Sequence, residues 1–366
     1  MRELLETVRA WQAEGEMPGR AVVIRTFGSA PRPEGAVLVV TADGRLAGSV
    51  SGGCVEGAAF EEILAARRAG VSRVIRYGIS DEQAWDVGLA CGGTIDVLVE
   101  PSLRPELLEA AAGMSGSVVV IPLPADAPGA AFGPHPPGTG EPPAAALRVA
   151  ADGTLGGTTG SPAADAEVVR AARAALAEGR SATVTVSGRQ YFLETYPAAP
   201  RLVVVGAVQV AMPLVDIAHV LGYLTVVIDG RAAFATRERF PDVDRLVVGW
   251  PDEVADEIGL GPADAVAVLT HDVKFDEPAI VVGLRRGCRY VGAVGSSKTQ
   301  ADRRARLRAA GLTEPELARL RGPIGLDLGG RAPAETALAI MAEIVAERHD
   351  GSGVPLHRLR RAGASG

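Results

Sequence analysis

The stretch Leu202-Val203-Val204-Val205-Gly206 decides the fold of the second half of this chain. Four consecutive apolar residues that end at a glycine are typical of a buried strand, and the apolar segment after Gly206 is typical of a helix. A second apolar run, 225–228, ends at Asp229. Because the alternation of strand, turn and helix continues from there, residues 199–348 are predicted to form a Rossmann-like doubly wound parallel sheet.

The turn after the first strand partly matches a dinucleotide-binding fingerprint. In such a turn the first glycine permits a tight bend, and an acid roughly 20 residues later bonds the ribose hydroxyls. Gly206, Ala207 and Asp229 occupy these places. Val208 stands where the fingerprint has its middle glycine, and its branched side chain would obstruct a pyrophosphate. The sequence therefore predicts the fold and leaves NAD(P) binding open.

Two later turns are candidate anion sites. One leads into Ser296, Ser297 and Lys298, and the other contains Gly325 and Asp327. The free N–H groups at the start of a helix attract negative charge, which is why such turns can hold a phosphate. Taken singly, each turn is explained more simply by helix capping.

The first half of the chain has the pattern of an α+β domain over residues 1–113. Residues 20–27 and 36–41 are predicted strands, and the glycine-rich segment 46–53 leads into a predicted helix that ends near Arg68. Further strands are predicted over 72–77 and 94–100.

A weaker echo of this pattern follows over residues 114–198. The segment 41–48 is matched by 150–157, and Ser161-Pro162-Ala163 stands where the first copy has Gly52-Gly53-Cys54. The echo is interpreted as a diverged repeat with a Pro/Gly-rich insertion at 122–145, although two chance patterns explain it equally well. The tail, 349–366, is predicted to be disordered.

Two of the three cysteines have unusual neighbours. Gly52 and Gly53 precede Cys54, and Gly92 and Gly93 follow Cys91. Paired glycines let a ligand reach both backbone amides and sulfur, which a buried structural cysteine does not need. Such thiols could bind a soft metal, form a redox disulfide or hold a sulfur-bearing cofactor. The spacing of structural zinc sites is absent, and Glu56 is placed to cap the following helix.

Composition excludes some classes of partner. The formal net charge of -7 argues against a nucleic-acid ligand, because phosphate backbones require clustered positive charge. The most apolar stretch, 202–228, is interrupted by polar residues and proline, so no membrane span is predicted. Few cysteines and no secretory signal favour a reducing compartment, and the cytoplasm is the expected location.

At this point the chain resembles the XdhC/CoxI family of xanthine dehydrogenase accessory proteins. The resemblance spans nearly the whole chain up to Arg348. Its motifs are Ser29–Gly35, Gly48–Glu56, Cys91–Gly93, Glu194–Pro197, Thr270-His271-Asp272, Val291–Ser296 and Gly322–Asp327. It implies a protein that binds molybdenum cofactor, protects it during sulfuration and passes it to a xanthine dehydrogenase or CO dehydrogenase type hydroxylase. The implied partners are that apoenzyme and a cofactor-sulfurating enzyme, and a homodimer is expected.

Residues and resemblance together predict a chaperone-like binding protein rather than a catalyst. Cys54 and Cys91 are expected to meet the dithiolene or metal end of the cofactor, while Arg32 and the later anion turns hold its phosphate in a cleft between the halves. The predicted cofactor-binding residues are Arg32, Gly52, Gly53, Cys54, Glu56, Cys91, Gly92, Gly93, Gly206, Ala207, Asp229, His271, Ser296, Ser297, Lys298, Gly325 and Asp327. An NAD(P)-binding oxidoreductase and a thiol-redox or metal-trafficking protein are the alternative functions.

Overall fold

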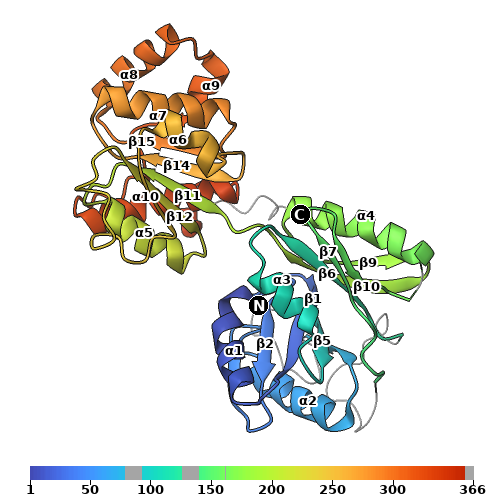
Figure 1. Ribbon diagram of the computed structural model, residues 1–366. Coiled ribbons are helices and arrows are strands. Elements are labelled where there is room, and N and C mark those ends of the chain that lie inside the picture. The colour runs from blue at the N-terminus through green and yellow to red at the C-terminus, as the bar shows by residue number, and fades with distance from the viewer. Residues whose placement is uncertain (79–92, 126–139, 161, 359–366) are drawn as a thin grey trace. The chain divides into compact units, whose positions relative to one another are not determined.

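The computed structural model describes residues 1–78, 93–125, 140–160 and 162–358. The chain divides into two compact units, Met1–Ala198 and Ala199–Gly366, which are coloured blue to green and yellow-green to red in Figure 1. Each unit is described separately below.

The first unit contains two five-stranded sheets with the same topology. Sheet 1 has the order β3-β2-β1-β5-β4 and sheet 2 the order β8-β7-β6-β10-β9, and every neighbouring pair is antiparallel. The strands of sheet 1 are β1 (Gly19–Phe27), β2 (Val37–Val40), β3 (Leu46–Gly48), β4 (Arg73–Tyr77) and β5 (Thr94–Glu100). Those of sheet 2 are β6 (Ser117–Pro122), β7 (Leu147–Ala150), β8 (Leu155–Gly157), β9 (Ala182–Val186) and β10 (Arg189–Tyr196).

The described residues of this unit also form four helices, after a short 3-10 turn, η1 (Arg2–Leu4). They are α1 (Leu5–Ala13), α2 (Glu56–Ala69), α3 (Pro105–Ala112) and α4 (Pro162–Glu178). Helix α2 packs on one face of sheet 1, and α4 packs on one face of sheet 2. The other faces of both sheets share one hydrophobic core with α1 and α3, which explains why the two halves form one compact unit.

The pairing registers make the two sheets comparable residue by residue. Across sheet 1 the paired residues are Gly48, Leu38, Ala21, Val99 and Arg73. Across sheet 2 the corresponding row is Gly157, Leu147, Val120, Leu193 and Ala182.

The two glycines in these rows have the same geometry. Gly48 and Gly157 have φ values of 84° and 87°. A Cβ at Gly48 would lie 2.2 Å from the carbonyl oxygen of Val37, and one at Gly157 would lie 2.3 Å from that of Ala146. Only glycine fits either position, because a side chain would collide with the neighbouring backbone. This equivalence supports the interpretation of a diverged repeat.

The second unit is a parallel six-stranded sheet in the order β13-β12-β11-β14-β15-β16. Its strands are β11 (Arg201–Val205), β12 (Leu224–Asp229), β13 (Arg245–Val248), β14 (Asp264–Val268), β15 (Tyr290–Ala293) and β16 (Leu320–Arg321). The strand order reverses direction at β11 and β14, as in doubly wound folds. The predicted fold class is confirmed: an antiparallel α+β first half and a Rossmann-like second half.

Helices cover both faces of this parallel sheet (Figure 1). On one face lie α5 (Ala211–Val220) and α10 (Pro333–Arg348). On the other lie α6 (Pro251–Ile258), α7 (Val273–Arg285), α8 (Ser297–Ala309) and α9 (Glu314–Ala318). A final 3-10 turn, η3, spans Leu356–Arg358. Cys288 is buried in the core beneath the second set of helices, and this burial raises the pKa of its thiol to about 12.

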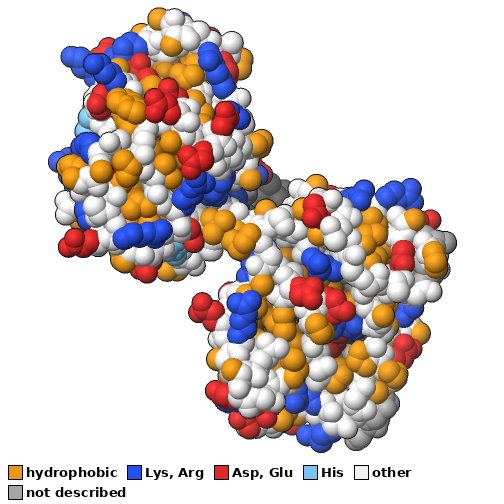
Figure 2. All heavy atoms as spheres, viewed as in Figure 1, with side chains coloured by type: hydrophobic (Ala, Val, Ile, Leu, Met, Phe, Trp, Pro, Cys, Tyr) orange, Lys and Arg blue, Asp and Glu red, His pale blue; other side chains and the backbone are white. Residues whose placement is uncertain are grey.

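On the visible faces of both units, acidic and basic side chains are interspersed with apolar ones (Figure 2). Within the described part of the chain, no helix is both long and apolar enough to cross a membrane.

Candidate functional site

Three of the segments predicted to bind a ligand lie at one end of sheet 1. Strand β1 ends at Phe27, which pairs with Thr94 at the start of β5. The segment that contains Arg32 therefore begins where β5 begins, and Gly93 precedes β5 directly. A Cβ on Gly93 would lie 2.7 Å from the carbonyl oxygen of Ser29, so these two backbones are in close contact. Cys91 and Gly92 lie outside the described residues.

The segment that contains Cys54 joins the same end of the sheet. Strand β3 ends at Gly48, and the next amide, Ser49 N–H, donates to the carbonyl of Val37 at the start of β2. The Arg32 segment leads into β2, and the Cys54 segment follows β3. Because β2 begins where β3 ends, both segments lie at the same end of sheet 1. The predicted meeting of these motifs is thus favoured by the strand topology.

The glycine-rich turn before α2 is organised by the carboxylate of Glu56. Its oxygens accept hydrogen bonds from the hydroxyl and amide groups of Ser51, at 2.6 and 2.9 Å, and from the amide of Gly53, at 2.8 Å. The Ser49 hydroxyl donates to it at 2.6 Å, and the Gly52 amide at 3.1 Å. Glu56 therefore holds the preceding turn in place.

These hydrogen bonds keep Glu56 ionised to an unusually low pH. Burial disfavours the ionised carboxylate, but hydrogen bonds from the hydroxyls of Ser49 and Ser51 outweigh burial and lower its pKa to about 2. Glu56 is thus an anion at neutral pH.

Two expectations about this turn need correction. We expected a ligand to reach the turn's backbone amides, yet the amides of Ser51, Gly52 and Gly53 donate to Glu56. We also placed Glu56 as a helix cap, whereas its carboxylate binds the turn before the helix. Its predicted role as a cofactor ligand stays a prediction. The physical reason is that a carboxylate close in sequence to several amides satisfies them at little entropic cost.

The thiol of Cys54 remains exposed and free. Gly52 and Gly53 have φ values of 78° and 125°, and a Cβ at either position would have no atom within 4 Å. Both glycines are therefore required by backbone conformation, and the space beside them is open. The turn presents an accessible sulfur on a backbone that its own glutamate fixes.

The second repeat keeps this turn without the thiol. Asp165, which corresponds to Glu56, accepts hydrogen bonds from the hydroxyls of Thr158 and Thr159 and from the amide of Thr159. Cys54 lies two residues before Glu56, and the residue two before Asp165 is Ala163. Only the first copy has kept a thiol at this turn.

In the second unit, Gly206 makes the predicted tight turn after β11. Its φ is 108°, and a Cβ would lie 2.3 Å from Cγ2 of Thr270, so no other residue fits without displacement. Ala207 is buried behind it, and Val208 packs partly against the adjoining core.

Asp229 has a different role from the one predicted. Its side chain is only 2% exposed. The carboxylate accepts from the amide of Ala207 at 2.8 Å, and from the amide and guanidinium of Arg231 at 2.8 to 2.9 Å. Burial opposes its ionisation, but the bonds from Arg231 and Ala207 lower the pKa. Asp229 joins the ends of β11 and β12 and does not present a free carboxylate to a ribose.

The later candidate residues follow neighbouring parallel strands, so they lie along the same edge of the sheet. His271 follows β14 and is exposed. Ser296 follows β15 and caps α8, its hydroxyl accepting from the amide of Thr299 at 3.2 Å. Ser297 and Lys298 are the first residues of α8. Helix capping thus accounts for the predicted anion turn at Ser296.

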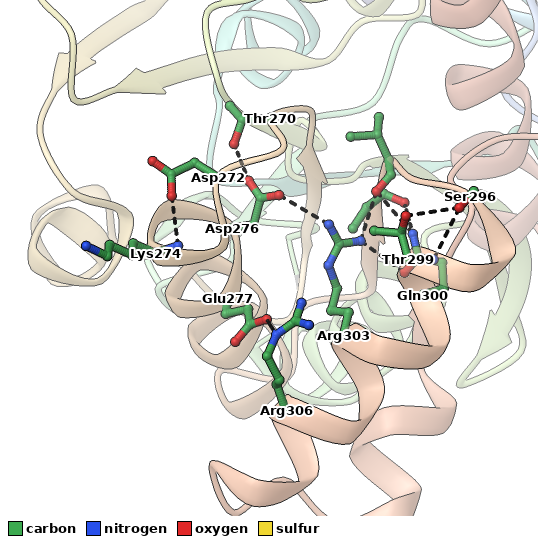
Figure 3. A network of polar contacts seen from close by, with 12 residues as sticks. Thr270, Asp272, Lys274, Asp276, Glu277, Ser296, Thr299, Gln300, Arg303 and Arg306 are labelled. Atoms are coloured by element: carbon green, nitrogen blue, oxygen red, sulfur yellow. Dashed lines mark hydrogen bonds and ion pairs between the residues drawn. The ribbon is translucent and has the colours of Figure 1, made fainter.

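A buried ion pair between α7 and α8 lies next to the segment that follows β14 (Figure 3). Asp276 on α7 accepts from the hydroxyl of Thr270 and lies 3.2 Å from Nη2 of Arg303 on α8. Burial raises the pKa of Asp276 in spite of these contacts. Neither Asp276 nor Arg303 was predicted from the sequence, because a charge in the middle of a helix normally indicates an exposed face.

The last predicted turn packs on α10. Gly325 has a φ of 95°, its amide donates to Glu343 at 2.8 Å, and a Cβ would lie 3.2 Å from the backbone of Ala339 and Ile340. Asp327 is exposed and accepts from the amide of Gly329 at 3.2 Å. Gly325 is therefore explained by close backbone packing.

The described residues contain no cluster of three or more histidine, cysteine or acidic side chains that could hold a metal ion. The predicted pair of metal contacts, Cys54 and Cys91, stays a prediction, because Cys91 lies outside the described part of the chain.

The fold and the sites define a two-part protein: a duplicated antiparallel half with an exposed thiol, and a Rossmann-like half. Two family models match it. One, described as the XdhC Rossmann domain, matches residues 202–344, and the other, described as the XdhC and CoxI family, matches 11–78 and 138–187. The chain belongs to the XdhC and CoxI family.

Two relatives and one solved structure match this chain over nearly their whole length. A Bacillus subtilis protein, named as a probable subunit of xanthine dehydrogenase, is 27% identical over 334 residues, which cover 90% of this chain and 92% of the relative. The "Molybdenum cofactor insertion chaperone PaoD" of Escherichia coli is 26% identical, covering 93% and 88%. A crystal structure described as a xanthine dehydrogenase from Bacillus halodurans is 25% identical, with a TM-score of 0.72 and coverage of 95% and 96%.

Proposed function

We propose that this protein binds molybdenum cofactor and delivers it to a molybdenum hydroxylase of the xanthine dehydrogenase or CO dehydrogenase type. The observation that carries the proposal is the exposed thiol of Cys54 on a turn fixed by Glu56. Family membership and the two named relatives support an accessory role. The proposal treats the cofactor as cargo, which the protein holds and then releases.

The chemistry of the turn suits a cargo that carries sulfur or a soft metal. A thiolate is a good ligand for soft metals, and an exposed one can be approached and left without unfolding the protein. Because Glu56 already satisfies the amides of the turn, the backbone does not have to rearrange when cargo leaves. The anionic Glu56 also disfavours a second negative group close to those amides. In this proposal the phosphate of the cargo is therefore bound elsewhere, by basic side chains such as Arg32.

The proposal is tested by the cofactor that the purified full chain retains. Wild type and Cys54→Ala are produced in a host that makes the cofactor, and molybdenum and pterin are measured per chain. Apo-hydroxylase is then added and its activation is followed. We expect Cys54→Ala to lose most of the bound molybdenum and the activation. Cys288→Ala is the control, because that thiol is buried in the second unit. Equal retention and activation by wild type and Cys54→Ala would refute the role of this thiol.

An NAD(P)-dependent oxidoreductase is the second candidate, favoured by the parallel sheet and the Gly206 turn. The engagement of Asp229 with Ala207 and Arg231 weighs against it. Calorimetric titration of the full chain with NAD and NADH distinguishes the two functions: saturable heat at millimolar ligand supports the oxidoreductase, and its absence excludes it.

A further inference from the structure

A large cavity lies between the two repeats of the first unit. Its volume is about 920 Å³. One wall is formed by the end of β1 and the segment that contains Arg32, and the other by the end of α4, the following turn and β9. Both walls belong to the compact unit Met1–Ala198. A volume of this size is typical of sites for small organic ligands.

The cavity exists because the two repeats have diverged at one corner. In the first repeat, Arg73 on β4 and Glu62 on α2 are buried and form an ion pair with Nε and Oε2 3.1 Å apart. The equivalent residues of the second repeat are Ala182, in the same row of its sheet, and Ala171, at the same distance from Asp165 along α4. Both alanines line the cavity. Two small side chains thus replace an ion pair that fills the corresponding corner.

The backbone contacts also differ between the two corners: one corner is joined to the other repeat by backbone hydrogen bonds, and the corner with the cavity is not. In the first repeat, Ser72 exchanges two backbone hydrogen bonds with Glu141, at 2.6 and 2.9 Å, which joins that corner to the other repeat. Its equivalent, Ser181, lines the cavity and accepts from the amide of Thr195 within its own sheet. The corner with the cavity therefore lacks the corresponding bridge.

Arginines on opposite walls of the cavity have hydrogen-bond donors to spare. Nε of Arg32 is buried without a hydrogen-bond partner among the described residues, and its Nη2 has only a 3.4 Å contact with the exposed Glu3. Arg180 has only a 3.3 Å contact with Glu178, and both of these side chains are more than half exposed. Such exposed pairs contribute little to stability and exchange readily for a better acceptor.

The other charges at the cavity are already committed. Glu34 accepts from the amide and hydroxyl of Thr26, at 3.0 and 2.6 Å. Arg25 is bound by Asp96 and Gln190. Phe27 also lines the cavity, and its side chain is 45% exposed. The guanidinium of Arg76 lies 5.2 Å from the centre of the Phe27 ring. A lining that combines guanidinium donors with spare hydrogen-bonding capacity and a partly exposed aromatic ring suits a planar molecule that carries a phosphate.

We infer that this cavity is a binding site for an organic phosphate with a planar ring, whose phosphate is bound by Arg32 and Arg180. A phosphate alone would fill only a small part of the volume, and the partly exposed ring of Phe27 favours a ligand that also carries a planar ring. The inference shares Arg32 with the proposed function, which assigns that side chain to the phosphate of the cargo. Its test uses a different ligand, so either proposal can fail while the other stands.

The test is calorimetric titration of the full chain with guanosine 5′-monophosphate, and with guanosine as the probe without phosphate. We expect saturable binding of the monophosphate and at least tenfold weaker binding of guanosine. Arg32→Ala and Arg180→Ala should each weaken monophosphate binding roughly tenfold or more, because a charge-assisted hydrogen bond is lost. Arg170→Ala is the control, an exposed arginine of α4 outside the cavity.

A second variant tests the origin of the cavity. The double substitution Ala171→Glu with Ala182→Arg introduces the ion pair that fills the other corner, and it should abolish binding while thermal unfolding stays cooperative. The inference is overturned if the monophosphate does not bind at millimolar concentration, if guanosine binds equally well, or if Arg32→Ala binds like wild type. The comparison of Arg32→Ala with wild type does not depend on the double variant, so it tests the inference even if that variant fails to fold.

Discussion

Nη1 of Arg20 lies 2.7 Å from Oε2 of Glu194, so a buried charge in sheet 1 is neutralised by an acid in sheet 2. The same guanidinium bonds Glu100, its cross-strand partner, at 2.6 Å. Glu100 and Glu194 directly follow Val99 and Leu193 and are equivalent in the two repeats. At the position of Arg20 the second repeat has Val119, so one arginine serves both acids. This asymmetry joins the repeats into one unit.

Replacing Arg20 by methionine should destabilise the first unit strongly. The change leaves Glu100 and Glu194 buried, and removing one member of a buried ion pair typically costs about 3–5 kcal/mol. Arg104 still bonds Glu100, whereas Glu194 keeps the neutral hydroxyl of Tyr196 and loses its positive partner, so Glu194 loses more. The measurement is chemical denaturation followed by circular dichroism. Arg170→Met on the exposed face of α4 serves as the control, and an equal midpoint for both variants would show that Arg20 does not join the repeats.

Glu56→Gln should loosen the turn around Cys54. The amide side chain lacks the negative charge and has a single acceptor oxygen, so several donors of residues 49–53 lose their partner, at a cost of about 1–3 kcal/mol. Hydrogen exchange of the peptide that contains the turn should become faster. Asp165→Asn makes the matched change in the second repeat and should leave that peptide unaffected. Unchanged exchange in Glu56→Gln would contradict the role assigned to this carboxylate.

The same carboxylate predicts an acid-dependent loss of order. Its pKa falls from 4.5 to about 2 in the folded protein. A depressed folded pKa stabilises the protein fully above the unfolded value, and this contribution is lost as the pH falls from about 4.5 towards 2. Exchange of the turn should therefore be constant at higher pH, after correction for intrinsic rates, and rise within this window. Glu56→Gln should lack that dependence, and an identical profile for both proteins would count against it.

Cys54 and Cys288 should differ sharply in reactivity. The exposed thiol of Cys54 should be alkylated by iodoacetamide in the folded protein, whereas Cys288 is buried and its pKa of about 12 disfavours the thiolate. Peptide mapping before and after denaturation measures both. Modification of Cys288 only after unfolding is expected, and protection of Cys54 in the native state would show that its thiol is not accessible.

Gly206→Ala should lower the free energy of unfolding by more than the backbone conformation alone accounts for. A residue other than glycine in the left-handed region costs roughly 1–2 kcal/mol, and here the Cβ would also collide with Thr270. Gly222→Ala is the matched control, because its φ is 74° and a Cβ there meets no atom within 4 Å. Thermal unfolding should separate the two variants, and equal shifts would exclude the collision.

Much of the architecture was predictable because it depends on local patterns. The run Leu202–Val205 and the acid at Asp229 indicated parallel strands, and the spacing of Gly48 and Gly157 indicated equivalent turns. Periodicity and glycine positions report which backbone conformations a segment can adopt. The family motifs, too, are short contiguous stretches that can be recognised one by one.

The partners of charged side chains were not predictable in this way. Local patterns suggested that Glu56 caps a helix and that Asp229 binds a ribose, and they carried no sign that Arg20 would find Glu194 or that Asp276 would find Arg303. Burial and hydrogen bonding decide such pairings, and both depend on residues brought together from distant positions.

The sequence by itself determined the two halves, the parallel sheet and the turn that carries Cys54, since these follow from local conformational preference. Only the tertiary structure decided which carboxylates accept hydrogen bonds from other groups of the protein, and where a cavity remains between the repeats. Packing two similar sheets on one core brings Ala171 and Ala182 beside the Arg32 segment, and no local pattern in the chain encodes that neighbourhood.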